Sequence, residues 1–150
     1  MEGSGIIQVG VIVKNIEETA KNWAEILDLP MPKINHVRPQ ELTRATYRGT
    51  PMMSNAKLCS FKLGTVNVEL CQPDETDSIW KEMLDRRGEG AVFLGFNVPD
   101  AKETTDMLEQ KGVALAQWGD TGGGTYSMMD SLGKLGVALN IKDRREKPAQ

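Results

Sequence analysis

The sequence lacks features that nucleic-acid-binding proteins and membrane proteins require. Its 150 residues include a single histidine, His36, and two cysteines. Acidic and basic residues nearly balance, with a net charge of −3, so a concentrated basic surface for nucleic acid is not expected. No apolar run approaches the roughly 20 residues of a membrane-spanning helix. We therefore expect neither nucleic acid nor a membrane as a partner.

The two termini and the cysteines indicate the cellular compartment in which we expect the protein. The first five residues lack the basic and apolar stretches of a secretory signal peptide, and we expect a flexible N-terminus over 1–5. Without an export signal, Cys59 and Cys71 are expected as reduced thiols. Residues 143–150 are dense in charges of both signs and are predicted to form a solvated C-terminal tail. These features predict a cytoplasmic protein.

The chain repeats itself at an offset of 85 positions. Residues 7–15 align with 92–100, where Gly10 matches Gly95, and Glu18-Thr19 matches Glu103-Thr104 without a gap. Similarity at a fixed offset indicates a duplicated supersecondary unit. The sequence thus predicts two copies of one structural module.

Periodicity, helix caps and turn residues predict a strand, a helix and about three strands, twice over. The predicted strands cover 6–13, 56–63, 66–71, 91–98, 113–118, 126–129 and 137–141, and helices begin at Asn15, Ser78 and Asp100. Residues 33–56 are expected to form an irregular flap with a strand near 43–48. We predict an α+β fold in a single domain over 6–142, with module one at about 6–72, module two at about 91–142 and a short joining helix over 78–87.

The alternation of side chains along the strands separates a core face from a polar face. In four strands one face is fully apolar, as in Val92, Leu94, Phe96 and Val98. The opposite faces carry polar side chains, namely Gln8, Asn67, Glu69, Asn97 and Asn140. Because these faces are too polar for a packed core, we expect them to line a ligand cleft.

The paired modules, the opening stretch Val9–Thr19 and the stretch Arg86–Gly90 resemble the vicinal oxygen chelate superfamily. The likeness is closest to methylmalonyl-CoA epimerase and glyoxalase I (lactoylglutathione lyase), and the superfamily also includes bleomycin resistance proteins. The resemblance implies a curved, partly open mixed sheet with helices outside, and a homodimer. It also implies a divalent metal held by one residue from each of four strands, which here are Gln8, Glu69, Phe93 and Asn140.

These four residues make a poor set of metal ligands. Glu69 is a good ligand and the two amides are weak ones, but Phe93 offers no donor atom. His36 lies in the flap and is expected in solvent. We therefore predict no resident cofactor, and at most a weakly held divalent metal.

The sequence predicts a divergent glyoxalase- or epimerase-like protein that binds a small carbonyl-bearing or anionic metabolite, such as a CoA thioester or a carboxylate, without that metal. Glu69 is the candidate catalytic residue, because a desolvated carboxylate suits a general base. The candidate ligand contacts are Gln8, Asn67, Phe93, Asn97, Tyr126, Met128 and Asn140, and Arg44 and Arg48 of the flap are further candidates for an anion.

The alternative is an active metal-dependent lyase or isomerase of lactoylglutathione lyase or methylmalonyl-CoA epimerase type, working by proton abstraction next to a carbonyl. Whether the protein is an enzyme stays open at this point.

Overall fold

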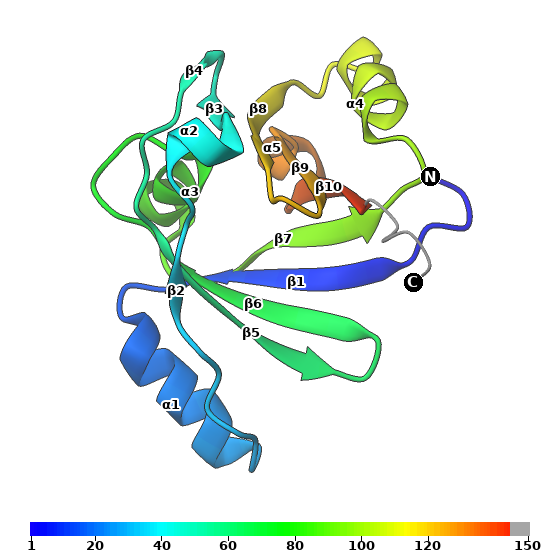
Figure 1. The fold of residues 1–150 in the computed structure, drawn as a ribbon. Coiled ribbons are helices and arrows are strands. Elements are labelled where there is room, and N and C mark those ends of the chain that lie inside the picture. Colours follow the sequence, from blue (N-terminus) through cyan, green and yellow to red (C-terminus); the bar gives the residue numbers. More distant parts are fainter. Residues whose placement is uncertain (145–150) are drawn as a thin grey trace.

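The computed structural model describes residues 1–144, which form ten strands and five helices (Figure 1). The first half contains β1 (Ile6–Ile12), α1 (Ile16–Ile26), β2 (Asn35–His36), α2 (Gln40–Thr43), β3 (Thr46–Tyr47), β4 (Thr50–Pro51), β5 (Lys57–Leu63) and β6 (Val66–Gln72). After α3 (Ile79–Arg87) follow β7 (Gly90–Asn97), α4 (Ala101–Gln110), β8 (Leu115–Asp120), β9 (Gly124–Met129), α5 (Leu132–Leu135) and β10 (Ala138–Arg144). The predicted tail 143–150 lies outside the described residues from position 145 onward.

The same local chemistry starts the equivalent helix of each module. At α1 the side chain of Asn15 accepts a hydrogen bond from the backbone N of Glu18 at 3.1 Å, and at α4 Asp100 accepts one from Glu103 at 2.9 Å. These side chains satisfy backbone donors that a first helical turn leaves free. Ser78 caps α3 in the same way, at 3.1 Å from the backbone N of Lys81. All three predicted helix starts are confirmed.

All ten strands belong to one mixed sheet, in the order β2-β5-β6-β1-β7-β10-β9-β8-β3-β4. In each module the first strand runs parallel to the last, β1 beside β6 and β7 beside β10. β1 and β7 pair antiparallel in the middle and join the two modules. The predicted architecture of paired βαβββ modules in a curved, open sheet is confirmed.

Two apolar clusters lie under the outer helices, on the convex side of the sheet. Ile16, Ala20 and Ala24 of α1 pack against β5 and β6. Ala101 and Leu108 of α4 pack against β9 and β10. Figure 1 shows these two helices at opposite ends of the molecule. They account for the apolar strand faces that the sequence predicts under helices.

A third cluster fills part of the concave side. Neighbouring residues of one strand point to opposite faces, so Leu70 belongs to the α1 cluster, whereas Cys71 belongs to the third cluster. This concave core also takes in Ile79, Trp80 and Met83 of α3, together with residues of the flap. α3 and the flap therefore cover part of the concave face.

The flap, residues 33–56, crosses from one edge of the sheet to the other. β2 pairs with β5 of the first module, whereas β3 pairs with β8 of the second. A short helix, α2, and the two-residue strand β3 stand where the sequence predicts a strand over 43–48. The predicted strand is thus wrong in its first half, because the flap turns back on itself at Arg44, which has a left-handed backbone (φ 49°).

Two further differences from the sequence prediction have local causes. The pairing of β7 with β1 shifts register between Phe93 and Ala91, and Val92 lies in the concave core with Phe93 instead of sharing the face of Leu94. Between the predicted strands 126–129 and 137–141 the sequence predicts only a connection over 133–136, whereas residues 132–135 form the helix α5, which ends at Gly136 with a positive φ of 77°.

The two cysteines are free, as predicted. Both are buried, and they lie in different apolar clusters on opposite faces of the sheet. Over residues 1–144, none of the helices is long and apolar enough to cross a membrane.

Candidate functional site

Gln8 of β1 and Asn140 of β10 form a hydrogen bond across the middle of the sheet. The Nδ2 of Asn140 donates to the Oε1 of Gln8 at 3.0 Å, and the two residues are only 4% and 3% exposed. Between their strands lies β7, where Gly95 is the register partner of both. A Cβ atom at position 95 would lie 2.7 Å from the Oε1 of Gln8. Glycine at this position therefore leaves room for Gln8 to reach Asn140.

This pair leaves one polar atom unsatisfied. Among the described residues, the Oδ1 of Asn140 is the only buried side-chain nitrogen or oxygen without a hydrogen-bond partner. Buried polar atoms are nearly always paired in native proteins, and an unpaired one costs about 1–3 kcal/mol. An unpaired atom of this kind marks a place where an ordered water or a ligand group would be stabilised.

Glu69 of β6 lies on the same face, beside Gly10 of β1. Burial raises the pKa of the Glu69 carboxyl above its ordinary value of 4.5, and the positive charge of Lys142 partly offsets this effect. Lys142 belongs to β10, and β1 and β7 lie between its strand and β6. The curvature of the sheet thus lets charges on β6 and β10 act on each other across the concave face.

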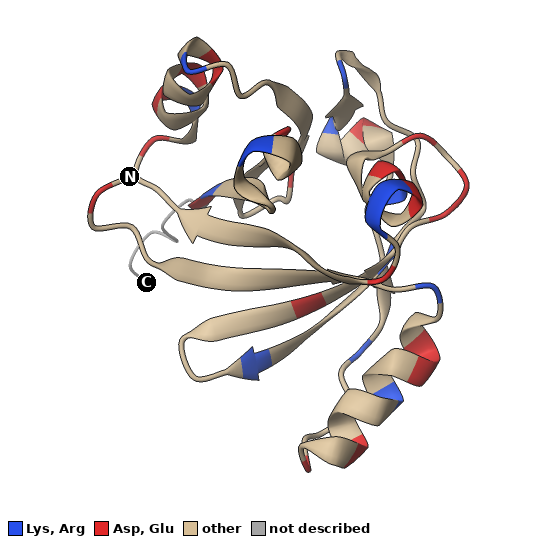
Figure 2. Ribbon diagram, turned by 180° about the vertical axis from the view of Figure 1, so that it is seen from behind, with Lys and Arg blue, Asp and Glu red and all other residues tan. Residues whose placement is uncertain are grey.

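We call Gln8, Asn67, Glu69 and Asn140 the polar cluster. Asn67 is half-buried and is the register partner of Gln8 on β6. Around the cluster, charges are scarce: β1 and β7 carry none, and Figure 2 shows Lys, Arg, Asp and Glu mainly on helices and loops. Because a carboxyl with a raised pKa is protonated more easily than an exposed one, Glu69 can serve as a hydrogen-bond donor or as a proton acceptor.

The hydroxyl of Tyr126, on β9, is positioned by the side chain of Gln117, on β8. The Nε2 of Gln117 donates to the Tyr126 hydroxyl at 3.2 Å, and its Oε1 accepts from the backbone N of Ile79 at 2.9 Å. The Tyr126 ring stacks on Trp80 of α3, with ring centroids 6.1 Å apart. Burial raises the pKa of Tyr126 well above its ordinary value. The hydroxyl therefore stays protonated, and its own proton can be donated to a ligand oxygen.

Sequence reasoning missed Gln117. The signal was available, because Gln117 is an amide between the apolar residues Ala116 and Trp118. Its partners are a helix that begins 38 residues earlier and a tyrosine nine residues later, and these only the fold brings together.

The other predicted contacts lie outside the polar cluster. Phe93 is 1% exposed in the concave core, and its ring lies directly over Gly10, where a methyl group would overlap three ring atoms. Met128 is buried in the same core. Asn97 is exposed at the end of β7. As ligand contacts, these three residues stay predictions.

The residues at the four metal-ligand positions do not fit a divalent metal. Glu69 offers one carboxylate, the Oε1 of Gln8 already accepts from Asn140, and the ring of Phe93 lies among them without a donor atom. Such metals prefer three or more imidazole, carboxylate or thiolate ligands. Within residues 1–144, no group of three or more His, Cys, Asp or Glu is arranged to hold a metal ion. His36 is exposed on the edge strand β2, with its Nδ1 3.3 Å from the carbonyl oxygen of Asn55.

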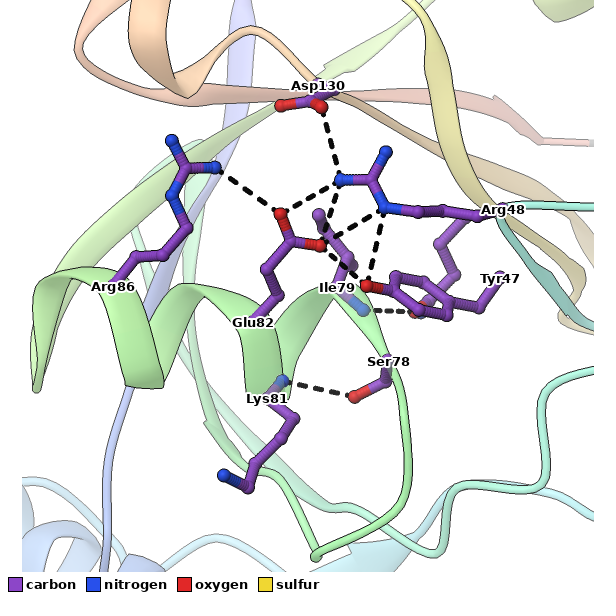
Figure 3. A network of polar contacts seen from close by, with 9 residues as sticks. Tyr47, Arg48, Ser78, Ile79, Lys81, Glu82, Arg86 and Asp130 are labelled. Atoms are coloured by element: carbon purple, nitrogen blue, oxygen red, sulfur yellow. Dashed lines mark hydrogen bonds and ion pairs between the residues drawn. The ribbon is translucent and has the colours of Figure 1, made fainter.

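A second polar network joins the flap to α3, as Figure 3 shows. The Tyr47 hydroxyl donates to Glu82 at 2.6 Å, and the Nη2 of Arg48 lies 2.9 Å from both Glu82 oxygens and 3.1 Å from Asp130. Although burial alone would raise the pKa of Glu82, the bonds from Tyr47 and Arg48 lower it. The network therefore fastens the flap over the concave core with Glu82 ionised.

The two flap arginines predicted to meet an anion are both paired with carboxylates of this chain. Arg48 belongs to the network just described. Arg44 pairs with Asp120 at 3.5 Å and lies over the ring of Trp118, with its guanidinium carbon 5.7 Å from the ring centroid. Their role toward a ligand stays a prediction.

Comparisons with known structures agree with this architecture. A hypothetical protein from Bacillus halodurans C-125 superposes with a TM-score of 0.68 at 15% identity, covering 99% of both chains. Methylmalonyl-CoA epimerase from Mycobacterium tuberculosis gives 0.63 at 17% identity, covering 95% of this chain and 89% of that one. A variant of the Streptomyces coelicolor methylmalonyl-CoA epimerase, in complex with 2-nitronate-propionyl-CoA, gives 0.65 at 15% identity, covering 97% and 99%. At such identities, the likeness shows the fold alone.

A comparison with curated proteins finds no match. The family model of the glyoxalase/bleomycin resistance protein/dioxygenase superfamily matches residues 7–128, which is most of the chain. The matched span begins in β1 and ends in β9, so it includes the first module and the second module as far as β9. The chain therefore belongs to the glyoxalase/bleomycin resistance protein/dioxygenase superfamily.

Proposed function

We propose that this protein binds a small metabolite with a carboxylate or carbonyl group at the polar cluster, without a resident divalent metal. The observation that carries the proposal is the buried Gln8–Asn140 pair with its unsatisfied Oδ1 atom, on the same face as Glu69. A protein that kept this face only for packing would lose little or no stability if both amides were replaced by apolar side chains of the same shape. The polar cluster is therefore better explained as a binding site.

The concave face offers donors for the oxygen atoms of such a ligand. The Tyr126 hydroxyl accepts from Gln117 and still has its own proton to donate. Glu69 becomes a donor when it is protonated, which burial favours. The charge of Lys142, which already acts on Glu69, would attract an anion. These groups suit a carboxylate or a polarised carbonyl, including the thioester of an acyl-CoA.

The first test is metal content of the purified, untagged protein, paired with calorimetric titration by nickel, cobalt and zinc. A thermal-shift and NMR screen of small carboxylates and acyl-CoA thioesters follows. We expect a metal content at background level. We also expect at least one carboxylate or thioester to bind, with an affinity that Glu69→Gln changes. Glu75→Gln is the matched control, because the Glu75 side chain is 98% exposed. Stoichiometric metal that disappears in Glu69→Gln would contradict the proposal.

A second candidate function is an isomerase or lyase that removes a proton next to a carbonyl. The raised pKa of Glu69 favours it, because a base of this kind needs a pKa nearer neutrality than that of an exposed carboxylate. The structural neighbours named methylmalonyl-CoA epimerase also support it. In such a step Glu69 would take the proton from carbon, and the Tyr126 hydroxyl would donate a hydrogen bond to the oxygen that gains charge.

Deuterium exchange tests the second candidate. Methylmalonyl-CoA is incubated in D2O with the protein, once with EDTA and once with cobalt, and loss of the α-proton signal is followed by NMR. Exchange that Glu69→Gln abolishes in EDTA would establish metal-free chemistry. Exchange only with cobalt would support the metal-dependent alternative, and no exchange in either leaves ligand binding as the function.

We further propose that the protein is a cytoplasmic homodimer. α1 packs on β5 and β6 and α4 on β9 and β10, so the convex face of β1 and β7 lies between the helices. There Ile6 is 43% exposed and Val9 and Leu94 are half-buried. A second copy would cover these apolar side chains, and the free thiols are consistent with a reducing compartment. Sedimentation of the wild type and of Ile6→Lys tests the dimer.

A further inference from the structure

A groove lies between α4 and the strands of the second module. It has a volume of about 420 Å³, with α4 forming one wall and β8, β9 and the end of β10 forming the other. Tyr126 and Met128 of β9 belong to the concave core, so Ser127 between them points to the opposite face of the sheet, where the groove lies. The groove is therefore separate from the polar cluster.

The Ser127 side chain lines this groove and has no hydrogen-bond partner within residues 1–144, although the residue is only 2% exposed. Because the Oδ1 of Asn140 is the only unpaired side-chain atom there that is wholly buried, the Ser127 hydroxyl must reach the surface of the groove. A hydroxyl can both donate and accept a hydrogen bond. The groove thus holds an unused polar group that a bound molecule would pair.

Carboxylates outnumber cations around the groove. Its charged lining residues are Asp100, Lys102, Asp106, Glu109 and Asp143. Lys102 pairs with Asp106 at 2.6 Å, and Asp100 caps α4, whereas Glu109 and Asp143 form no ion pair with a described cation. The pKa of Lys102 is raised, mainly by its hydrogen bond to Asp106 and also by the charges of Asp100 and Glu109. The potential along this wall therefore favours a positive charge.

Strand register places Ser127 between the two carboxylates that lack a cation. On one side, Asp143 is the register partner of Thr125, two residues before Ser127. On the other side, Glu109 accepts a hydrogen bond at 3.2 Å from the backbone N of Leu115, whose register partner lies two residues after Ser127. Such diagonal neighbours lie about 7–8 Å apart, within reach of a small ligand. A cation that pairs with the Ser127 hydroxyl would thus lie between two negative charges.

The remaining lining favours an organic cation over a metal ion. Trp118 is the register partner of Ser127 and, with Leu115, gives the groove an apolar surface. Arg44 lies over the Trp118 ring and pairs with Asp120, but it does not line the groove. Within residues 1–144, no group of three or more His, Cys, Asp or Glu is arranged to hold a metal ion. The groove therefore suits a molecule with both an apolar and a cationic part.

We propose that this groove is a second binding site, for a small primary amine with an apolar body. Its ammonium group would donate to the Ser127 hydroxyl and lie between Glu109 and Asp143, and its body would lie against Trp118. A primary ammonium has three N–H donors for these acceptors, whereas a quaternary ammonium has none. The site goes beyond the proposed function and does not depend on it.

Phenethylamine and two analogues test the site. 2-Phenylethanol replaces the ammonium by a neutral hydroxyl, and phenethyltrimethylammonium keeps the charge but has no N–H. Each compound is titrated into 15N-labelled protein, and amide shifts are followed. We expect saturable binding of phenethylamine with shifts centred on Trp118 and Ser127, and binding of 2-phenylethanol about tenfold weaker. The trimethylated analogue should also bind more weakly. No saturable binding of phenethylamine, shifts elsewhere, or equal affinity of either analogue would overturn the proposal.

Three variants complete the test. Ser127→Ala should weaken phenethylamine binding by about threefold or more, and it should fold normally because the hydroxyl has no partner to lose. Asp143→Asn should weaken binding as well, and this loss should shrink in 1 M NaCl. Glu103→Gln is the matched control, because Glu103 is an exposed carboxylate of α4 that does not line the groove. Wild-type affinity in both Ser127→Ala and Asp143→Asn, or an equal loss in Glu103→Gln, would overturn the proposal. Failure of the carboxylate and thioester screen would overturn the proposed function alone.

Discussion

Replacing Gly10 by alanine should destabilise the fold by about 2 kcal/mol. The added methyl group would overlap three atoms of the Phe93 ring. That ring is 1% exposed and packs in the concave core with Ile12, Trp80 and Met83, so it cannot swing aside without moving its neighbours. Overpacking of this kind costs about 1–3 kcal/mol, and the severe overlap places Gly10→Ala at the upper end. Alanine regains about 0.5–1 kcal/mol, because glycine is the poorer residue within a strand.

Urea unfolding, followed by circular dichroism and tryptophan fluorescence, measures this loss. Gly133→Ala is the matched control, since its Cβ would meet nothing within 4 Å, and it should leave stability unchanged or slightly raised. In a Phe93→Leu background the penalty of Gly10→Ala should shrink, and a double-mutant cycle gives the coupling between the two positions. A Gly10→Ala protein within about 0.5 kcal/mol of the wild type, a change typical of an uninvolved site, would refute the reasoning that the ring is fixed over Gly10.

Three further predictions concern the polar groups. Burial raises the pKa of the Glu69 carboxyl above 4.5, so the native state binds the carboxyl proton more tightly than the unfolded chain does. The stability of the wild type relative to Glu69→Gln should therefore fall as the pH rises above 4.5. Thermal unfolding of both proteins across a range of pH measures the difference. Gln117→Leu should cost about 2 kcal/mol in urea unfolding, because it removes the partners of the Tyr126 hydroxyl and of the first backbone N–H of α3. Arg48→Met should cost about 1 kcal/mol, because Arg48 pairs with Glu82 and Asp130 but is partly exposed; the loss should be smaller in 1 M NaCl, and an equal loss at both salt concentrations would contradict an ionic origin.

The order of the elements could be predicted from the sequence because its signals are local. Asn15 and Asp100 are caps within three residues of the groups they bind, and the offset of 85 between them reports the duplication directly. The polar face could be predicted in part, because side-chain alternation requires only the strand itself. That rule failed at Val92, where a shift in strand pairing changes the face and leaves no mark in the residues nearby.

The sequence by itself determined the fold and the residue types of the site. Periodicity, caps and the internal repeat act over a few residues, and the poor donor set at the metal positions is visible in the residues alone. Only the tertiary structure decided which of those residues meet. The bond between Gln8 and Asn140 spans 132 positions and depends on Gly95 in the strand between them. Likewise, α3 and the flap cover part of the concave face, and these two segments are brought together there only by the fold. Such contacts depend on distances in space, which a pattern along the chain does not record.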